Sequence, residues 1–181
     1  MTDFGRRTVC PECPECPECP VCPEVVPNVL PKTGQTIEYW PGDDGTYQAG
    51  WEGERFTDNG DGTITDNATS LMWIKDALDP AINMIDRTWY DQVDHIEALE
   101  YAGHADWRMP NMNELMSLID WAFTFVLINE VFLNAQDIRL QSSTTDGTGE
   151  TDWVWYWSGW YNYPEEYEKT SLNKSLCVRV K

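Results

Sequence analysis

Five cysteines near the N-terminus form the most distinctive chemical pattern in this sequence. They recur at every third position, and a proline follows each of them: Cys10, Cys13, Cys16, Cys19 and Cys22. Proline fixes its own backbone and keeps the preceding residue out of the helical region, so the repeat favours polyproline II with three residues per turn. All five thiols are then expected along one edge of an extended arm.

The spacing of these thiols decides which bonds they can form. Polyproline II rises about 3.1 Å per residue, so successive cysteines lie roughly 9 Å apart along the edge. A disulfide requires Cα atoms within about 7 Å of each other. We therefore expect the arm to form disulfides with other chains or with the body of the protein. The body contains one cysteine, Cys177, and a bridge from it to the arm would allow all six cysteines to pair.

A metal-binding arm is the main alternative. Cysteines separated by two residues are also the ligand pattern of zinc and iron–sulfur sites, and thiolates can hold nickel or copper, for electron transfer or metal storage. In thiolate knuckles a glycine commonly turns backbone amides toward the sulfur, whereas here proline follows every cysteine. The pattern favours disulfides without a cofactor over a metal-loaded arm.

Charge and cysteine content limit the partners and the compartment. The chain has 12 Lys and Arg against 31 Asp and Glu, a net charge of -19. This field repels phosphate backbones, so we expect no nucleic-acid partner, and the absence of a run of about 18 apolar residues predicts no membrane span. Because disulfides persist in oxidising surroundings, we expect an extracellular or cell-surface protein of bacterial type, with its signal peptide removed.

Length and composition predict one globular domain behind the arm. The 181 residues suffice for an arm and linker over residues 1–32 and one domain over residues 33–181. Ten Trp, eight Tyr and five Phe bury large areas, so a loop-rich fold can still be stable. Short strands are predicted beside Asn-Gly and Asp-Gly turn signals and near the C-terminus, at residues 55–57, 63–65, 70–75, 153–157 and 176–180.

Two helices are predicted between these strands. The first spans residues 88–101, with Thr88 as its N-cap and Gly103 as its stop. The second begins after Asn111, whose side chain can cap it while that of Glu114 reaches back. Its apolar stripe is Leu115, Leu118, Ile119 and Ala122. Together these elements predict an α+β domain with two helices and short antiparallel strands.

Oxygen-bearing side chains crowd the predicted turn and could hold Ca2+. They are Asp58, Asn59, Asp61 and Asp66. The spacing is not that of an EF-hand loop, because Gly60 occupies the third position counted from Asp58. A glycine-rich turn with solvated carboxylates is the simpler interpretation, and calcium is the alternative.

Aromatic residues alternate along the predicted strand at residues 153–157. The set comprises Trp153, Trp155 and Trp157, followed closely by Trp160 and Tyr161. Alternate residues of a strand face the same side, so the three strand tryptophans should share one face. Such a set can pack in a core, form a subunit interface or stack on sugar rings, and we favour these roles in that order.

Catalysis is not expected. His95 and His104 are the two histidines of the chain, one in the predicted first helix and one in a Gly-His-Ala-Asp-Trp turn. Neither has the sequence context of a Ser-His-Asp or Cys-His centre, so both are interpreted as structural. We therefore expect the protein not to be an enzyme.

Several blocks in order along the chain carry a family resemblance. They are RFTDNGDGTITDNATSLMW over residues 55–73, GHADWRMP over residues 103–110, SSTT over residues 142–145 and CVRVK over residues 177–181. Together they resemble the Lcl C-terminal domain family over about residues 33–181. The resemblance implies a C-type-lectin-like fold, akin to that of formylglycine-generating enzymes. It also implies binding or assembly in secreted or surface bacterial proteins, some of them collagen-like adhesins.

Two departures limit what the resemblance implies. Relatives that bind sulfated polysaccharides need a positive surface, which a net charge of -19 does not provide. Many relatives carry a cysteine in the first helix that pairs near the C-terminus, but no cysteine lies between Cys22 and Cys177 here. Cys177 is thus left for the arm, and the cysteine pair of the formylglycine-generating activity is missing.

These observations predict a structural subunit of an extracellular or cell-surface assembly, such as a filament or appendage. Its copies would associate with one another and be cross-linked through the arm. A metal-thiolate arm for electron transfer or storage is one alternative. A carbohydrate-binding surface adhesin, with the aromatic set as its platform, is the other.

Overall fold

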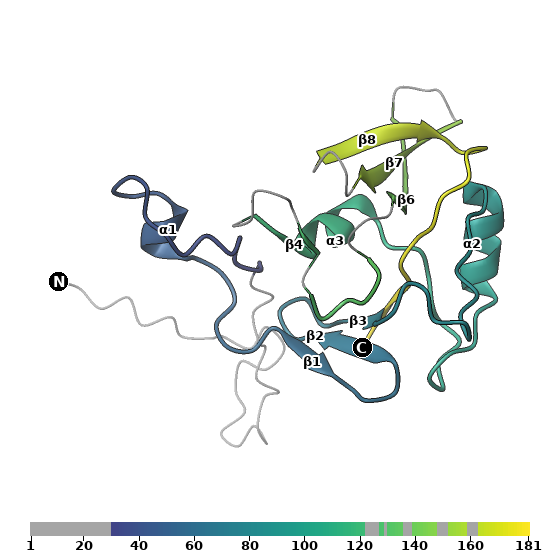
Figure 1. The fold of residues 1–181 in the computed structure, drawn as a ribbon, viewed down its shortest axis with the longest axis horizontal. Coiled ribbons are helices and arrows are strands. Elements are labelled where there is room, and N and C mark those ends of the chain that lie inside the picture. Colours follow the sequence, from purple (N-terminus) through teal and green to yellow (C-terminus); the bar gives the residue numbers. More distant parts are fainter. Residues whose placement is uncertain (1–29, 122–126, 129, 136–138, 148–151, 159–162) are drawn as a thin grey trace, which may run out of the picture.

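The computed structural model describes residues 30–121, 127–128, 130–135, 139–147, 152–158 and 163–181. These residues form an α+β domain, as predicted, with three helices and nine antiparallel strands in three sheets. The helices are α1 (Asp44–Tyr47), α2 (Trp89–Glu97) and α3 (Met112–Ser117). In Figure 1 the two larger sheets lie on either side of α3, and α2 covers one flank. Among the described residues, no helix is long and apolar enough to cross a membrane.

The first sheet is built on the predicted hairpin. Its strands, in spatial order, are β1 (Phe56–Asp58), β2 (Thr63–Asp66), β3 (Leu71–Ile74) and β9 (Val178–Val180). Gly60 and Gly62, in the turn between β1 and β2, both have positive φ. A Cβ at Gly62 would also lie 1.9 Å from the hydroxyl oxygen of Tyr101. Glycine is therefore required at position 62 for its backbone angle and for its size.

The second sheet contains one predicted strand and two that the sequence did not indicate. Its strands, in spatial order, are β6 (Arg139–Thr145), β7 (Trp153–Ser158) and β8 (Tyr163–Glu168). The strand β6 buries polar residues because other segments bond to them. The Gln141 N–H donates to the carbonyl of Lys174 (2.8 Å), and the Ser142 hydroxyl donates to the carbonyl of Trp155 (2.7 Å). A short third sheet pairs β4 (Ile119–Asp120) with β5 (Leu127–Ile128).

The first predicted helix begins where it was predicted to begin, but it ends earlier than predicted. The Thr88 side chain accepts the N–H of Asp91 and caps α2. The helix ends at Glu97 instead of continuing to residue 101. The chain tightens there into a shorter turn, in which the N–H of Leu99 donates to the carbonyl of Ile96 (3.1 Å).

The second predicted helix is also shorter than its apolar stripe. Leu115 and Leu118 are buried as predicted, but α3 ends at Ser117. Ile119 is buried in strand β4, where it pairs with Ile128. Ala122, the last residue of the predicted stripe, lies outside the described residues. The apolar pattern therefore predicted burial correctly and helix length incorrectly, because a strand can continue the same buried face.

Two hydrophobic clusters make up the core. The larger lies between the two main sheets and includes Ile64, Trp73, Leu115, Leu118, Phe132, Leu140, Trp157, Leu176 and Val178. The smaller packs against α2 and consists of Ile74, Ile82, Met84, Ile96, Leu99, Trp107, Met109 and Cys177. Successive side chains of an extended segment face opposite sides, so residues 176–178 contribute to both clusters.

A buried ion pair ties β2 to the residue before β1. Asp66 has a fully buried carboxylate, and Arg55 donates to it from Nη2 (2.8 Å) and Nε. The carboxylate also accepts the N–H of Ala68 (3.0 Å). Removing one partner of a buried pair leaves the other charge uncompensated, so this pair should be sensitive to substitution.

Asp66→Asn is expected to lower the free energy of unfolding by about 3 kcal/mol, because Arg55 would keep a largely buried charge without its carboxylate. Urea unfolding at neutral pH, followed by tryptophan fluorescence, measures the loss. Asp58→Asn is the matched control, since its pair with Lys75 is partly exposed and the substitution should change stability little. Equal losses in the two variants would contradict the importance of burial.

Candidate functional site

The described part of the chain includes one of the six predicted cysteines. Cys10, Cys13, Cys16, Cys19 and Cys22 lie outside the described residues. Cys177 is described, and it is a fully buried free thiol in the smaller core cluster. A bridge from Cys177 to the arm would therefore require the core to open. The pairing itself stays a prediction.

Backbone hydrogen bonds on both sides hold Cys177 in the core. The N–H of Ile74 donates to its carbonyl (3.1 Å), and Arg108 and Val178 exchange two hydrogen bonds of 2.9 and 3.0 Å. Burial raises the pKa of the Cys177 thiol far above its ordinary value. Because the thiolate is the form that attacks disulfides and binds metals, burial disfavours both reactions at Cys177 in the folded protein.

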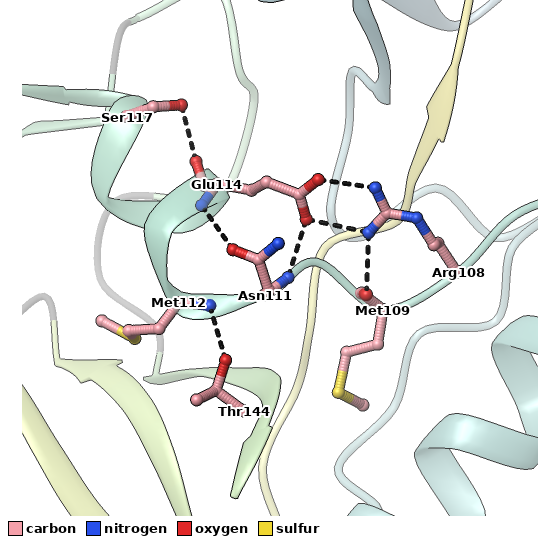
Figure 2. Close-up of polar contacts among 7 residues, drawn as sticks. All are labelled: Arg108, Met109, Asn111, Met112, Glu114, Ser117 and Thr144. Carbon is pink, nitrogen blue, oxygen red and sulfur yellow. Dashed lines mark hydrogen bonds and ion pairs between the residues drawn. The ribbon is translucent and has the colours of Figure 1, made fainter.

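A hydrogen-bond network fixes the segment that pairs with the last strand (Figure 2). The Arg108 guanidinium donates from Nη1 to the Glu114 carboxylate (2.8 Å), which also accepts the N–H of Asn111 (2.8 Å). The Asn111 side chain accepts the N–H of Glu114 in return (3.0 Å), so the predicted capping box is confirmed. Thr144 of β6 accepts the N–H of Met112 (3.0 Å). The network thus connects α3, β6 and the neighbour of β9.

The predicted aromatic set is divided between core and surface. Trp157 is buried in the larger cluster, and Trp121 packs against it edge to face at 6.5 Å between ring centroids. Trp153 and Trp155, on the same face of β7, are half-buried. Trp160 and Tyr161 lie outside the described residues. Core packing therefore applies to Trp157, and the interface and sugar roles of the set stay predictions.

The oxygen-bearing residues of the hairpin have partners within the chain. Asp58 pairs with Lys75 (2.6 Å), and the side chains of Asn59 and Asp61 bond to the hydroxyl of Thr63 (2.8 and 2.6 Å). The fourth predicted residue, Asp66, lies at the other end of β2, in the buried ion pair. In the part of the chain that the structure describes, no three His, Cys, Asp or Glu side chains gather as a group that could hold a metal ion. Calcium binding at this turn stays a prediction.

Both histidines have structural contacts. Nε2 of His95 lies 2.8 Å from the carbonyl oxygen of Ile82, and this contact joins α2 to the loop before it. The ring of His104 packs edge to face on Trp107, with 6.2 Å between centroids. These contacts give each histidine a role in packing.

A cleft that the sequence did not indicate lies beside the start of the described chain. It has a volume of about 400 Å³, and its lining includes Lys32, Trp51, Glu54, Arg55, Phe56, Asp120 and Val131. We call it the Trp51 cleft. The carbonyl of Leu30 accepts the N–H of Trp51 (3.0 Å), so the residues that follow the arm form part of its wall. Local patterns could not predict this cleft, because its residues come from separate segments that meet only in the fold.

Comparison with known proteins assigns the domain to a family. The model of the Lcl C-terminal domain matches residues 62–179, which is more than half of the chain. The chain belongs to the Lcl C-terminal domain family. No curated protein matches it. The family prediction is therefore confirmed. The Lcl match includes α2, α3 and Cys177, but it leaves out the arm and the lining residues of the Trp51 cleft that precede residue 62.

The Glu114 network should make the stability of the Lcl domain depend on pH. Burial raises the pKa of Glu114, but the hydrogen bonds from Arg108 and Asn111 outweigh it and hold the pKa below its ordinary value of 4.5. A group with a lowered pKa in the folded state stabilises the fold fully above its unfolded-state pKa. That contribution is lost as the pH falls through the folded-state pKa.

Glu114→Gln is expected to lower the free energy of unfolding by about 1.5 kcal/mol at neutral pH, because it weakens charge-assisted hydrogen bonds at the helix cap. The difference from the wild type should narrow as the pH falls below 4.5, the ordinary pKa of the group, because the wild-type carboxylate is then protonated on passing its lowered folded-state pKa. Urea unfolding at a series of pH values from neutral to acid measures this narrowing, with the exposed Glu97→Gln as control. A difference that does not change with pH would argue against an ionised Glu114.

Burial of Cys177 can be tested by thiol labelling. In a variant with serine at all five arm positions, Cys177 should react with a maleimide on the order of 100-fold more slowly than an exposed thiol, because it is reached only when the core opens. Complete labelling is expected in concentrated guanidinium chloride. Intact mass spectrometry measures both states. Rapid labelling of the folded variant would contradict the buried position.

Proposed function

We propose that this chain is a structural, non-enzymatic subunit of an extracellular or cell-surface assembly, such as a filament or appendage. In this proposal, disulfides between the arms of different subunits hold the copies together. The observation that carries the proposal is the position of Cys177 in the core. It leaves the surface of the described domain without a cysteine for the arm to meet.

The expected geometry of the arm supplies the second step. Neighbouring cysteines in a polyproline II arm are too far apart to pair with each other, so their partners must come from elsewhere. With Cys177 buried, that partner is a cysteine of another chain. The odd number of arm cysteines, five, favours the same conclusion, because pairing within one arm would leave at least one thiol unpaired.

In this proposal the Lcl domain is the packing body of the subunit, with a C-type-lectin-like fold. Family membership supports that fold. A further support is that β9 pairs with β3, so the end of the domain returns to the sheet at its start. The buried ion pair at Asp66 and the Glu114 network join separate segments of the body, which suits a subunit that repeats in an assembly.

Electrophoresis and intact mass, with and without reductant, test the cross-linked assembly. Purified native protein is expected to give species of dimer mass and above that collapse to the 20.9 kDa chain on reduction. Cys177→Ala should keep this ladder, and serine at all five arm positions should abolish it. Native protein that is monomeric without reductant would contradict the proposal. Stoichiometric iron, zinc, nickel or copper in the same sample would support the metal-thiolate arm instead.

A further inference from the structure

A loop near the start of the described chain exposes large apolar side chains. We call residues 35–48, which include α1, the aromatic loop, and it stands apart from the sheets in Figure 1. Ile37, Tyr39, Trp40 and Tyr47 are 60%, 77%, 77% and 72% exposed. Apolar groups that gather in contact with water usually mark an interaction surface, so a partner that covers these rings is expected.

One carboxylate holds the aromatic loop in shape. The Asp43 side chain accepts the N–H groups of Tyr39 (2.9 Å), Trp40 (3.3 Å) and Thr46 (3.1 Å), and also the amide of Gln35 (2.9 Å). The exposed rings are therefore attached to an ordered backbone, and binding would cost little further ordering of that backbone.

The aromatic loop is also negatively charged. Its carboxylates are Glu38, Asp43 and Asp44. Glu38 accepts a hydrogen bond from the hydroxyl of Thr46 (2.9 Å), and Asp44 accepts one from the hydroxyl of Thr33. Within the described residues, the ion pairs of the chain use none of these three carboxylates. The loop therefore favours a partner that combines positive charge with a flat surface, which is what an Arg side chain offers to a Trp or Tyr ring.

The cations of the domain itself are largely engaged. In the described part of the chain, ion pairs use Lys32, Arg55, Lys75, Arg108, Lys174 and Arg179. Arg139 lies over the ring of Tyr167, and Lys169 lies over the ring of Trp89. The Arg87 guanidinium donates to a backbone carbonyl (2.9 Å). The body of a second copy therefore offers little positive charge to the loop.

Two adjacent arginines precede the cysteine repeat. Arg6 and Arg7 lie outside the described residues, within residues 4–11, which contain no Asp or Glu and include Phe4. This stretch combines two guanidinium groups with an aromatic side chain. Its chemistry is therefore complementary to that of the aromatic loop.

The point where the arm joins the domain indicates which loop these arginines can reach. The carbonyl of Leu30 accepts the N–H of Trp51 (3.0 Å), so the arm leaves the domain close to the end of its own aromatic loop. In polyproline II, which the cysteine repeat predicts, the chain from Leu30 back to Arg7 extends roughly 70 Å. An extended arm therefore carries its arginines away from its own loop and toward a neighbouring copy.

We propose that Arg6 and Arg7 of one subunit bind the aromatic loop of a second copy of this chain. The inference rests on the proposed role as an assembly subunit and gives the arm a noncovalent anchor. In this contact the guanidinium groups stack on the exposed rings and face the carboxylates of the loop. Arm and loop are different patches of one chain, so the contact is heterologous, and each copy can bind one neighbour through its arm and another through its loop.

Sedimentation velocity of the full chain with serine at all five arm cysteines, under reducing conditions, tests this anchor without disulfides. Concentration-dependent association is expected. Arg6→Ser combined with Arg7→Ser should weaken it by about tenfold or more, because both guanidinium groups are lost. Arg139→Ser combined with Lys181→Ser removes the same charge from two exposed positions of the domain. This control should leave the affinity within about twofold.

Trp40→Ser tests the loop half of the contact. It removes an exposed ring but keeps the backbone N–H that donates to Asp43, so the loop should hold its shape. Association should again weaken by about tenfold or more. Leu172→Ser, at an exposed apolar position elsewhere, is the control and should have little effect. Circular dichroism of each variant verifies folding.

Mixing the two defective proteins gives the sharpest result. The variant without Arg6 and Arg7 keeps an intact loop, and Trp40→Ser keeps intact arginines. An equimolar mixture should therefore form a one-to-one heterodimer although neither protein associates alone. A reduced protein that stays monomeric at every concentration, as it would if each arm folded back on its own loop, would overturn the inference, and so would association that survives loss of both arginines. Disulfide-linked species of the native protein would still stand in either case, so the two proposals fail separately.

Discussion

The C-terminal segment, residues 176–180, is the element on which the rest of the fold depends. Leu176 and Val178 belong to the hydrophobic cluster between the sheets, and Cys177 belongs to the cluster against α2. The same segment is hydrogen-bonded to Ile74 on one side and to Arg108 on the other. Burial of apolar surface is the dominant favourable term in folding, and three consecutive residues contribute it to both halves of the core. The sheets and α2 are therefore held as one cooperative unit.

Charge gives the surface of this unit little attraction for its own copies. In the described part of the chain, six ion pairs engage Lys32, Arg55, Lys75, Arg108, Lys174 and Arg179, which is half of the 12 Lys and Arg. The whole chain has 31 Asp and Glu, so negative charge dominates. In the proposed assembly, attraction between copies would then come from chemistry other than surface charge, such as the thiols of the arm or exposed rings.

Local signals in the sequence predicted the parts of the fold that local interactions build. The Asn-Gly and Asp-Gly turn, the Thr88 cap and the capping box at Asn111 all depend on residues close in sequence, and the structure has each of them. Strand β6 is polar and is buried only because distant segments bond to it. Strand β8 contains Pro164 and three glutamates, which a sheet tolerates at an edge. Neither strand has the alternation of apolar and polar residues that would predict a strand from the sequence.

The same distinction applies to the candidate sites. The arm repeat is visible in the sequence because its spacing carries the chemistry. The buried position of Cys177 had one signal, its place between Leu176 and Val178 near an apolar strand, but its neighbours come from α2 and the loops beside it. The Trp51 cleft and the pair of Arg55 with Asp66 exist only after the hairpin and later segments have packed together.

The position of residues 176–178 near the end of the chain also affects when the core can close during synthesis. Synthesis proceeds from the N-terminus, so the arm is made long before these three residues, which both hydrophobic clusters need to be complete. In the proposed assembly, the thiols of the arm would therefore be present before the core can close. Completion of the core would then shield one sulfur, that of Cys177, and leave crosslinking to the arm.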